Sequence, residues 1–210
     1  MQPKTVHLFV YDTLADWEPG YAVAGINNPA HQREPGRYRV RTVGVGTAPV
    51  TTTGGVRIVP DMAADGLDPA ESAMLILPGG DVWDGGGGVP EAVEKARAFL
   101  AAGVPVAAIC GATAGLARGG LLDDVDHTSN AAEYLAFTGY GGAGRYRGEP
   151  AVRDGTLITA SGTAPLEFAR EIFRALDLYE PRVLDAWYAL FKTGDASAFH
   201  ALEAEAGQPA

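Results

Sequence analysis

The 210-residue chain has a single cysteine, no long apolar run and few basic residues. One cysteine cannot form an internal disulfide, so the fold depends on its core. The longest apolar runs are strand-sized and broken by Pro or Gly, well short of the roughly 20 residues that a membrane-spanning helix needs. The N-terminus lacks the basic region and apolar core of a signal peptide. These absences predict a cytoplasmic protein without a membrane span.

Positive charge is scarce as well, with 16 Lys and Arg against 26 Asp and Glu, a net charge of -10. A polyanion is therefore a poor partner, and we expect neither nucleic acid nor an anionic membrane to bind. The histidines and the cysteine lack metal-ligand spacing, and no calcium-loop pattern is present, which predicts no metal site. Glycine runs at 85–88 and 139–144 do not open a helix after a strand, so we predict no nucleotide cofactor.

Short apolar runs alternate with helical patterns along the whole chain, and no linker divides it, which predicts one domain over residues 1–210. The predicted strands cover 6–11, 38–45, 73–77 and 104–109. Predicted helices cover 90–102, 112–118 and 165–176, besides a helix-like stretch that ends near residue 30. Gly-Gly at 54–55 and Asp-Gly at 154–155 predict two hairpins. The alternation predicts an α/β fold, a mostly parallel sheet with helices on both faces.

The only cysteine, Cys110, stands where an apolar strand should turn sharply into a helix. At a helix N-terminus the free amides and the macrodipole favour an anion, so a lowered thiol pKa is expected. Gly111 and Ala112 leave space for a strained turn of the nucleophile-elbow kind, although the literal pattern of alternate glycines is absent. The alternative is that Cys110 is a small core hydrophobe. The elbow context makes it the candidate nucleophile.

Gly79 and Gly80 directly follow the predicted strand 73–77. Residues without a Cβ let backbone amides approach a ligand closely, so the N–H groups of Gly80 and Gly111 are candidates for an oxyanion hole. The alternative for the glycine pair is a plain turn. Ligands of parallel sheets bind beyond the C-terminal strand edges, where these glycines, Cys110 and the segment after Tyr11 should meet.

Five segments match a known pattern: YDTLADWE at 11–18, LILPGG at 75–80, AAICGAT at 107–113, HTSN at 127–130 and TASGTAPLEFA at 159–169. Together they make the chain resemble the ThiJ/PfpI superfamily over nearly its whole length. It is most similar to the branch labelled intracellular protease/amidase or type 1 (class I) glutamine amidotransferase-like. The resemblance implies a flavodoxin-like three-layer sandwich with an elbow cysteine at Cys110.

The resemblance also implies that a carboxylic acid after the first strand points at the cysteine, and Glu18 occupies that place. Two adjacent anions cannot both ionise cheaply, so a carboxyl beside a thiolate should stay protonated and donate a hydrogen bond to the sulfur. Glu18 would then also donate or relay a proton. Asp16 is the second candidate. The alternative for both is ordinary acidity at a helix start.

Many catalytic members of the superfamily place a histidine where Asn130 stands here. Asn130 can hydrogen-bond a substrate or the thiolate, but it cannot act as a general base. His127 either approaches through a loop or is structural. Amide cleavage needs a proton delivered to the leaving nitrogen, so protease activity is doubtful. No His-x-Glu pair follows Ser161, which argues against glutaminase activity.

Three functions remain open. The leading one is a cysteine-dependent hydrolase or lyase that acts on a small electrophile; the resemblance implies amides, isocyanides or α-oxoaldehydes as substrate classes. The second is a redox or electrophile stress sensor that reversibly oxidises Cys110, and the third is a binding module with an inert cysteine.

The apolar spacing at 183, 184, 187, 190 and 191 predicts a helix packed on the sheet or in a homodimer.

Overall fold

A seven-stranded sheet forms the centre of the computed structural model, which describes residues 2–85 and 87–206. The strand order is β5-β2-β1-β6-β7-β9-β8, and each pairing is parallel except that of β8 with β9. Gly86, in the predicted 85–88 loop, lies outside the described residues. The strands are β1 (Lys4–Phe9), β2 (Tyr38–Gly44), β5 (Met62–Ala63), β6 (Ser72–Leu77), β7 (Val106–Ile109), β8 (Ala151–Asp154) and β9 (Leu157–Ala160).

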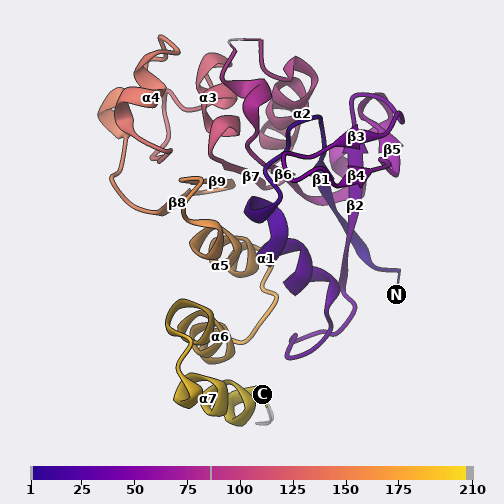
Figure 1. The fold of residues 1–210 in the computed structure, drawn as a ribbon, viewed down its shortest axis with the longest axis vertical. Helices are drawn as coiled ribbons and strands as arrows, with labels where there is room; N and C mark the ends of the chain where they lie inside the picture. The colour runs from indigo at the N-terminus through magenta and orange to yellow at the C-terminus, as the bar shows by residue number, and fades with distance from the viewer. Residues whose placement is uncertain (1, 86, 207–210) are drawn as a thin grey trace.

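Helices cover both faces of the sheet (Figure 1). On one side lie α2 (Pro90–Ala101), α3 (Gly111–Arg118) and α4 (Ala132–Ala136), and on the other α1 (Trp17–Asn27) and α5 (Pro165–Ala175). Beyond α1 and α5, α6 (Pro181–Thr193) and α7 (Ala196–Ala206) form a hairpin that extends away from the sheet. The predicted flavodoxin-like α/β sandwich is confirmed.

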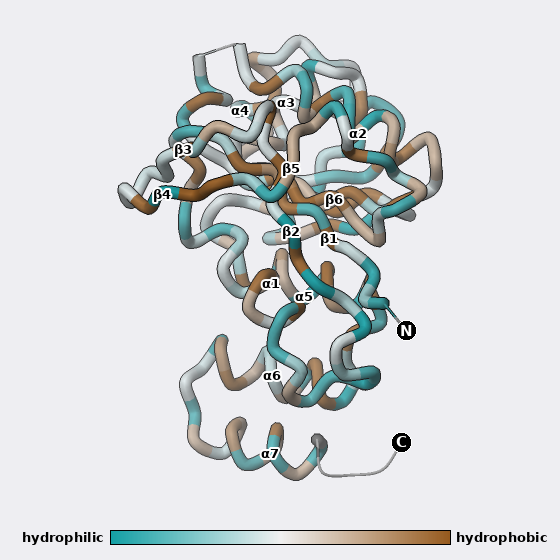
Figure 2. Tube along the Cα trace, turned by 90° about the vertical axis from the view of Figure 1, so that its right-hand side faces the viewer, coloured by the Kyte–Doolittle hydropathy of each residue, from teal (hydrophilic) through white to brown (hydrophobic). Residues whose placement is uncertain are grey.

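The central strands are apolar and buried, as parallel strands covered on both faces should be. All four residues of β7 and of β9 are buried, and so are the last four of β6. Figure 2 shows this apolar layer between the two helical layers. Because the three strands run in parallel, the turns after Leu77, Ile109 and Ala160 leave the sheet at the same edge. Within the described residues no helix is long and apolar enough to cross a membrane.

Both predicted hairpins form. β8 and β9 pair across Gly155, which has a φ of 56°. β3 (Val50–Thr51) and β4 (Arg57–Ile58) pair antiparallel in a small separate sheet, with Gly55 at a φ of 81° between them. A positive φ suits glycine because it has no Cβ to clash with the backbone.

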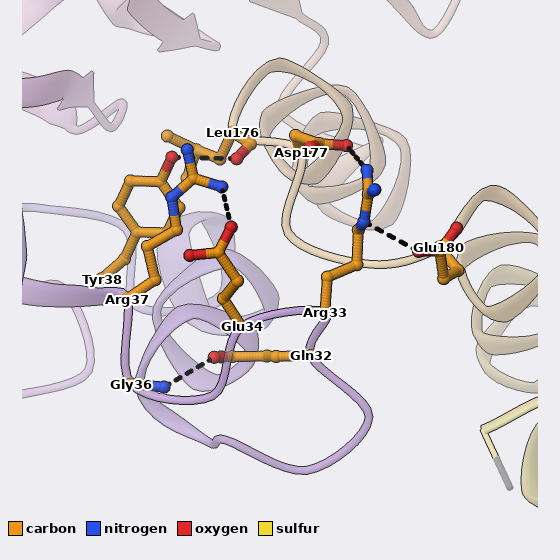
Figure 3. Close-up of polar contacts among 9 residues, drawn as sticks. All are labelled: Gln32, Arg33, Glu34, Gly36, Arg37, Tyr38, Leu176, Asp177 and Glu180. Atoms are coloured by element: carbon orange, nitrogen blue, oxygen red, sulfur yellow. Dashed lines mark hydrogen bonds and ion pairs between the residues drawn. The ribbon is translucent and has the colours of Figure 1, made fainter. Parts of the chain in front are cut away.

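A polar network joins the connection after α1 to the connection between α5 and α6 (Figure 3). Arg33 binds Asp177 through Nη1 at 2.5 Å and Glu180 through Nε at 2.8 Å. The Tyr38 hydroxyl donates to the Leu176 carbonyl at 3.0 Å. The Gln32 amide donates to three carbonyls at the C-terminal end of α1, which leaves fewer of the terminal carbonyls without a partner. The network holds α1 against the start of the α6–α7 hairpin.

Candidate active site

Cys110 lies at a strained turn between β7 and α3. Its φ of 57° and ψ of -126° are unusual for a residue with a side chain. Its amide donates to the Ala160 carbonyl at 3.0 Å, and its carbonyl accepts from the Thr113 amide at 3.1 Å and hydroxyl at 2.5 Å. The surrounding hydrogen bonds therefore hold the strained conformation that the sequence pattern predicted for an elbow.

Trp83 packs under the first turns of α3, and two glycines make room for it. A Cβ at Gly111 would lie 2.8 Å from Trp83 Cβ, and one at Gly115 would lie 2.2 Å from Trp83 Cζ3. The indole N–H donates to the Tyr11 hydroxyl at 2.8 Å, and that hydroxyl donates to the Pro78 carbonyl. The elbow helix is thus tied to the turn after β6.

Glu18 is completely buried in the first turn of α1. Its Oε2 accepts a hydrogen bond from the Gly79 amide, and its Oε1 is buried without a partner that meets hydrogen-bond geometry. A Cβ at Gly162 would lie 2.7 Å from the Cys110 sulfur and 3.2 Å from Glu18 Oε1. Glycine at 162 therefore leaves the space in which the thiol and the carboxyl stand next to each other.

The carboxyl and the thiol disfavour each other's ionisation. Burial raises the pKa of Glu18 to about 7, while hydrogen bonds from Gly79 and Cys110 act in the opposite direction. Burial and the negative charge of Glu18 raise the pKa of Cys110 to about 12, against the hydrogen bond from Asn130. The expected protonation of Glu18 near neutral pH agrees with its raised pKa. The expected lowering of the thiol pKa does not hold in this geometry, because burial and the carboxylate outweigh the helix terminus.

Asn130 contacts the thiol directly. Its Nδ2 donates to Cys110 Sγ at 3.3 Å, and its Oδ1 accepts from the Gly162 amide at 2.8 Å. The preceding Ser129 hydroxyl lies 2.6 Å from that of Thr113 in the elbow helix. The 127–130 segment is therefore fixed to α3, and its Asn130 presents an amide N–H that can donate to a sulfur anion.

Of the two candidate oxyanion amides, that of Gly111 contacts the thiol. The Gly111 amide hydrogen-bonds to the thiol and acts to lower its pKa. Gly80 follows Gly79 in the turn, and a Cβ there would lie 2.5 Å from the Thr13 carbonyl oxygen. Glycine at 80 is thus required by a close backbone approach. The Gly79 amide is already used by Glu18, so Gly80 and Gly111 stay the predicted oxyanion donors.

The structure separates Asp16 and His127 from the thiol. Asp16 accepts hydrogen bonds from the Thr52 hydroxyl at 2.6 Å and the Gly54 amide at 2.7 Å, so it holds the β3–β4 hairpin. His127 is fully buried. One ring nitrogen lies 2.8 Å from the Val125 carbonyl and the other 3.0 Å from the Tyr140 hydroxyl. Both ring nitrogens are therefore engaged away from Cys110, which fits the structural alternative for this histidine.

Sequence reasoning did not identify two further groups at the site. The Trp17 indole N–H donates to the Gly162 carbonyl at 3.2 Å, and the side chain is 56% exposed. The Tyr134 hydroxyl donates to Asp84 at 2.7 Å, and burial raises the pKa of Tyr134, with a smaller contribution from Cys110. The adjacency of Trp17 to Glu18 is the one signal that could have pointed to Trp17.

No group of three or more His, Cys, Asp or Glu within residues 2–85 and 87–206 is arranged to hold a metal ion. The side chains and backbone amides at the site supply one candidate nucleophile, one buried carboxyl and several hydrogen-bond donors. It can attack an electrophilic carbon, accept or return one proton, and stabilise a negative charge.

Fold and site together define a class of α/β proteins that carry a buried carboxyl beside an elbow cysteine. The sequence model of the DJ-1/PfpI family matches residues 4–175. The chain belongs to the DJ-1/PfpI family, as the resemblance to ThiJ/PfpI proteins predicted.

Two relatives from Bacillus subtilis (strain 168) match most of the chain. "Uncharacterized protease YoaZ" is 41% identical over 197 residues, which is 92% of this chain and 93% of that protein. "Uncharacterized protease YdeA" is 33% identical over 184 residues, or 87% of this chain and 88% of that protein.

Solved structures agree with the fold. A thiJ/pfpI family protein from Bacillus anthracis has a TM-score of 0.89 and 41% identity, with 97% of each chain covered. A DJ-1 superfamily protein from Agrobacterium tumefaciens has a TM-score of 0.80 and 33% identity, with 91% of this chain and 98% of that chain covered.

Proposed function

We propose that this protein is a cysteine-dependent hydrolase or lyase for a small electrophilic substrate. The observation that carries the proposal is the placement of the Cys110 sulfur between a buried carboxyl and an amide donor. A strained elbow presents the sulfur at the sheet edge where ligands of parallel sheets bind. Amides, isocyanides and α-oxoaldehydes are the substrate classes that the family resemblance suggests.

In the proposed reaction, the thiol proton moves to Glu18 as sulfur attacks the substrate carbon. Glu18 Oε1 is the acceptor, since it is buried next to the thiol and no other side chain or backbone group of the described residues hydrogen-bonds to it. Amides of Gly80 and Gly111 stabilise the oxygen that becomes negative. Glu18 then returns the proton to the leaving group or to a carbanion. In hydrolysis, water attacks the carbon bound to sulfur, the C–S bond breaks, and one proton of that water re-forms the Cys110 thiol. In a lyase reaction the C–S bond breaks as the product leaves, and the sulfur takes up a proton through Glu18. A raised pKa of about 7 suits a carboxyl that both accepts and returns a proton near neutral pH.

Peptide hydrolysis is a poor match to this site. A leaving amine needs a proton donor close to its nitrogen. The family resemblance implies a histidine at the place of Asn130 in many catalytic members, and an asparagine cannot supply that proton. His127 directs its ring nitrogens to Val125 and Tyr140. We therefore expect activity on small activated substrates and no turnover of folded or unfolded protein.

The test is a turnover assay with small amides, isocyanides and α-oxoaldehydes, compared among the wild type, Cys110→Ala and Glu18→Gln. We expect the alanine variant to lose turnover on the true substrate and the glutamine variant to lose roughly 10²–10⁴-fold, the usual contribution of a positioned acid or base. Wild-type kcat/KM should rise with pH through about 7, as Glu18 becomes able to accept the proton. Full turnover by Cys110→Ala would rule out the mechanism.

A second candidate is a non-turnover redox or electrophile stress sensor. Peroxide would oxidise the sulfur to a sulfenic acid, with water as the reduced product, and a second equivalent would give a sulfinic acid. The specific support is again Glu18 Oε1, because a protonated carboxyl there can donate to an oxygen bound to sulfur. Peroxide titration with intact-mass detection tests it. Resistance like that of an ordinary buried thiol would count against sensing.

A further inference from the structure

A cavity lies outside the cysteine site, between α1 and the α6–α7 hairpin. Its volume is about 680 Å³, within the range of about 300–1,000 Å³ that small-molecule sites have. Aromatic side chains from all three helices, and one from the connection before α6, line it: Trp17, Tyr21, Tyr179, Trp187, Phe191 and Phe199. Figures 1 and 2 both show the hairpin standing away from the sheet next to α1.

The aromatic rings that line the cavity pack against one another. The Tyr21 ring lies edge-on to Phe191 at 5.4 Å between centroids, and the Trp187 ring lies 5.1 Å from Phe191. Trp187 is 8% exposed, whereas Phe191 and Phe199 are each 49% exposed. A Cβ at Gly20 would meet nothing within 4 Å, so α1 leaves space on this face. The cavity is therefore built into the fold and has half-exposed aromatic rings.

Two ionisable side chains are among the residues that line the cavity. Glu203 from α7 and His31 from the connection after α1 both line it, with Glu203 Oε1 3.5 Å from His31 Nε2. The polar network around Arg33 fixes that connection to the start of α6 (Figure 3). A carboxylate next to aromatic faces attracts an organic cation, by ion pairing and by cation–π contact. The net charge of -10 adds to that attraction.

We propose that this cavity binds a small organic ammonium compound that carries an aromatic or alkyl group. The apolar group lies among the aromatic rings, and the ammonium group lies next to Glu203. This inference is independent of the proposed chemistry at Cys110. Trp17 links the two sites, because its ring lines the cavity while its indole N–H holds the Gly162 carbonyl beside the thiol.

The test is calorimetric titration of the full-length protein with three matched probes: phenylbutyl trimethylammonium, phenylpentanol and phenylpentanoate. Tryptophan fluorescence gives a second readout, since two of the three tryptophans line the cavity. We expect saturable binding, with the cation bound about tenfold more tightly than the anion. Neither readout requires turnover, so failure here and failure of the proposed enzyme activity are distinguishable.

Variants locate the binding. Phe199→Ala should weaken binding of the cation several-fold, and Glu203→Gln should remove most of the preference for the cation. Phe137→Ala is the matched control, because Phe137 is 88% exposed and does not line the cavity; it should change nothing. Circular dichroism checks that each variant folds.

Three results would overturn the proposal. One is the absence of saturable binding by any probe at millimolar concentration. Another is equal affinity for the three probes, which would remove the cation as the ligand class. The third is a dimer by light scattering that Phe199→Ala dissociates, which would show that a second copy of the chain covers the cavity.

Discussion

At the scale of single residues, the ionisation of Glu18 and that of Cys110 are coupled. Both pKa values are raised, mainly by burial. Because one negative charge disfavours a second beside it, the pair keeps one proton over a wide pH range above neutrality. Which atom holds that proton decides whether the sulfur is nucleophilic.

Replacing Glu18 with Gln should stabilise the protein at alkaline pH. The pKa of Glu18 rises from 4.5 to about 7 on folding, so the folded state binds more protons between these values. The contribution of Glu18 to the free energy of unfolding is fully present below pH 4.5 and is lost as pH rises through about 7. A glutamine carries no such penalty, and we expect a gain of up to ~3 kcal/mol at pH 8 and little gain near pH 5. Urea unfolding at both pH values measures it.

Asp16→Asn is a control for which the change in stability at alkaline pH should have the opposite sign. The pKa of the Asp16 carboxyl is lowered, mainly by the hydrogen bond from Thr52, so folding favours the ionised form. This stabilisation is lost as pH falls through the lowered pKa. The asparagine variant should be less stable than the wild type at pH 8. A glutamine at position 18 that destabilised the protein equally at both pH values would contradict the burial argument.

The rate of Cys110 alkylation against pH reports the state of the thiol directly. With Glu18 ionised, we expect the midpoint of the alkylation rate against pH to lie above the pKa of about 8.5 that a free thiol has. Glu18→Gln should move the midpoint down, because the neighbouring negative charge disappears. Asn130→Ala should move it up, because its amide lowers the thiol pKa. A wild-type midpoint well below 8.5 would instead show a thiolate stabilised by protonated Glu18.

At the scale of elements, the elbow depends on how closely α3 approaches Trp83. Strand β7 and helix α3 could be predicted from local patterns, and so could both hairpins, because a buried strand, a helix face and a glycine turn each have a short-range signature. Helix α7 and the short elements β5 and α4 were not predicted. Predicted strand 6–11 is observed as Lys4–Phe9, since apolar residues continue past the last ladder position.

Gly115→Ala tests this packing. The new Cβ would lie 2.2 Å from Trp83 Cζ3, a ring that is completely buried. Either the ring or α3 must move, and we expect a loss of about 1–3 kcal/mol in the free energy of unfolding. Gly20→Ala is the matched helical control, with nothing within 4 Å of its Cβ. It should gain roughly 0.5–1 kcal/mol from helix propensity. Similar effects of the two changes in urea unfolding would contradict the packing argument.

At the scale of the whole molecule, the α6–α7 hairpin extends beyond the sheet and its covering helices. The sequence predicted that the apolar face of α6 packs on the sheet or in a homodimer. In the structure α6 packs mainly against α5 and α7, because α5 separates it from the sheet. Val183, Leu184 and Trp187 are buried, whereas Phe191 is half exposed. Core packing therefore explains most of the pattern that suggested an interface.

A homodimer stays a prediction, and light scattering at micromolar concentration tests it. A mass of twice the 21.8 kDa chain would support association, and the exposed Val45, Val56 and Val59 would be candidates for the contact besides Phe191. A mass of 21.8 kDa at every concentration would remove it. Repeating the measurement with Phe191→Ala shows whether α6 contributes.

The sequence by itself determined the alternation of strands and helices along the chain, the family, and the position of the candidate nucleophile. Apolar periodicity, turn residues and the elbow motif act over a few residues, so they can be recognised in one dimension. It also pointed to Glu18 and Asn130, by resemblance to proteins with the same motifs. The candidate Asp16 and the alternatives for His127 could not be settled from the sequence.

Only the tertiary structure decided how these groups act. Asp16 binds the β3–β4 hairpin and His127 binds Tyr140 because their partners come from distant segments. The pKa of the Cys110 thiol is raised because the thiol is buried and lies near the Glu18 carboxylate. Neither effect can be recognised from the local helix-start pattern. The aromatic cavity exists because α1 and α6–α7, far apart in sequence, pack side by side. Desolvation, Coulomb energy and enclosed volume depend on distances in space, which local sequence patterns do not encode.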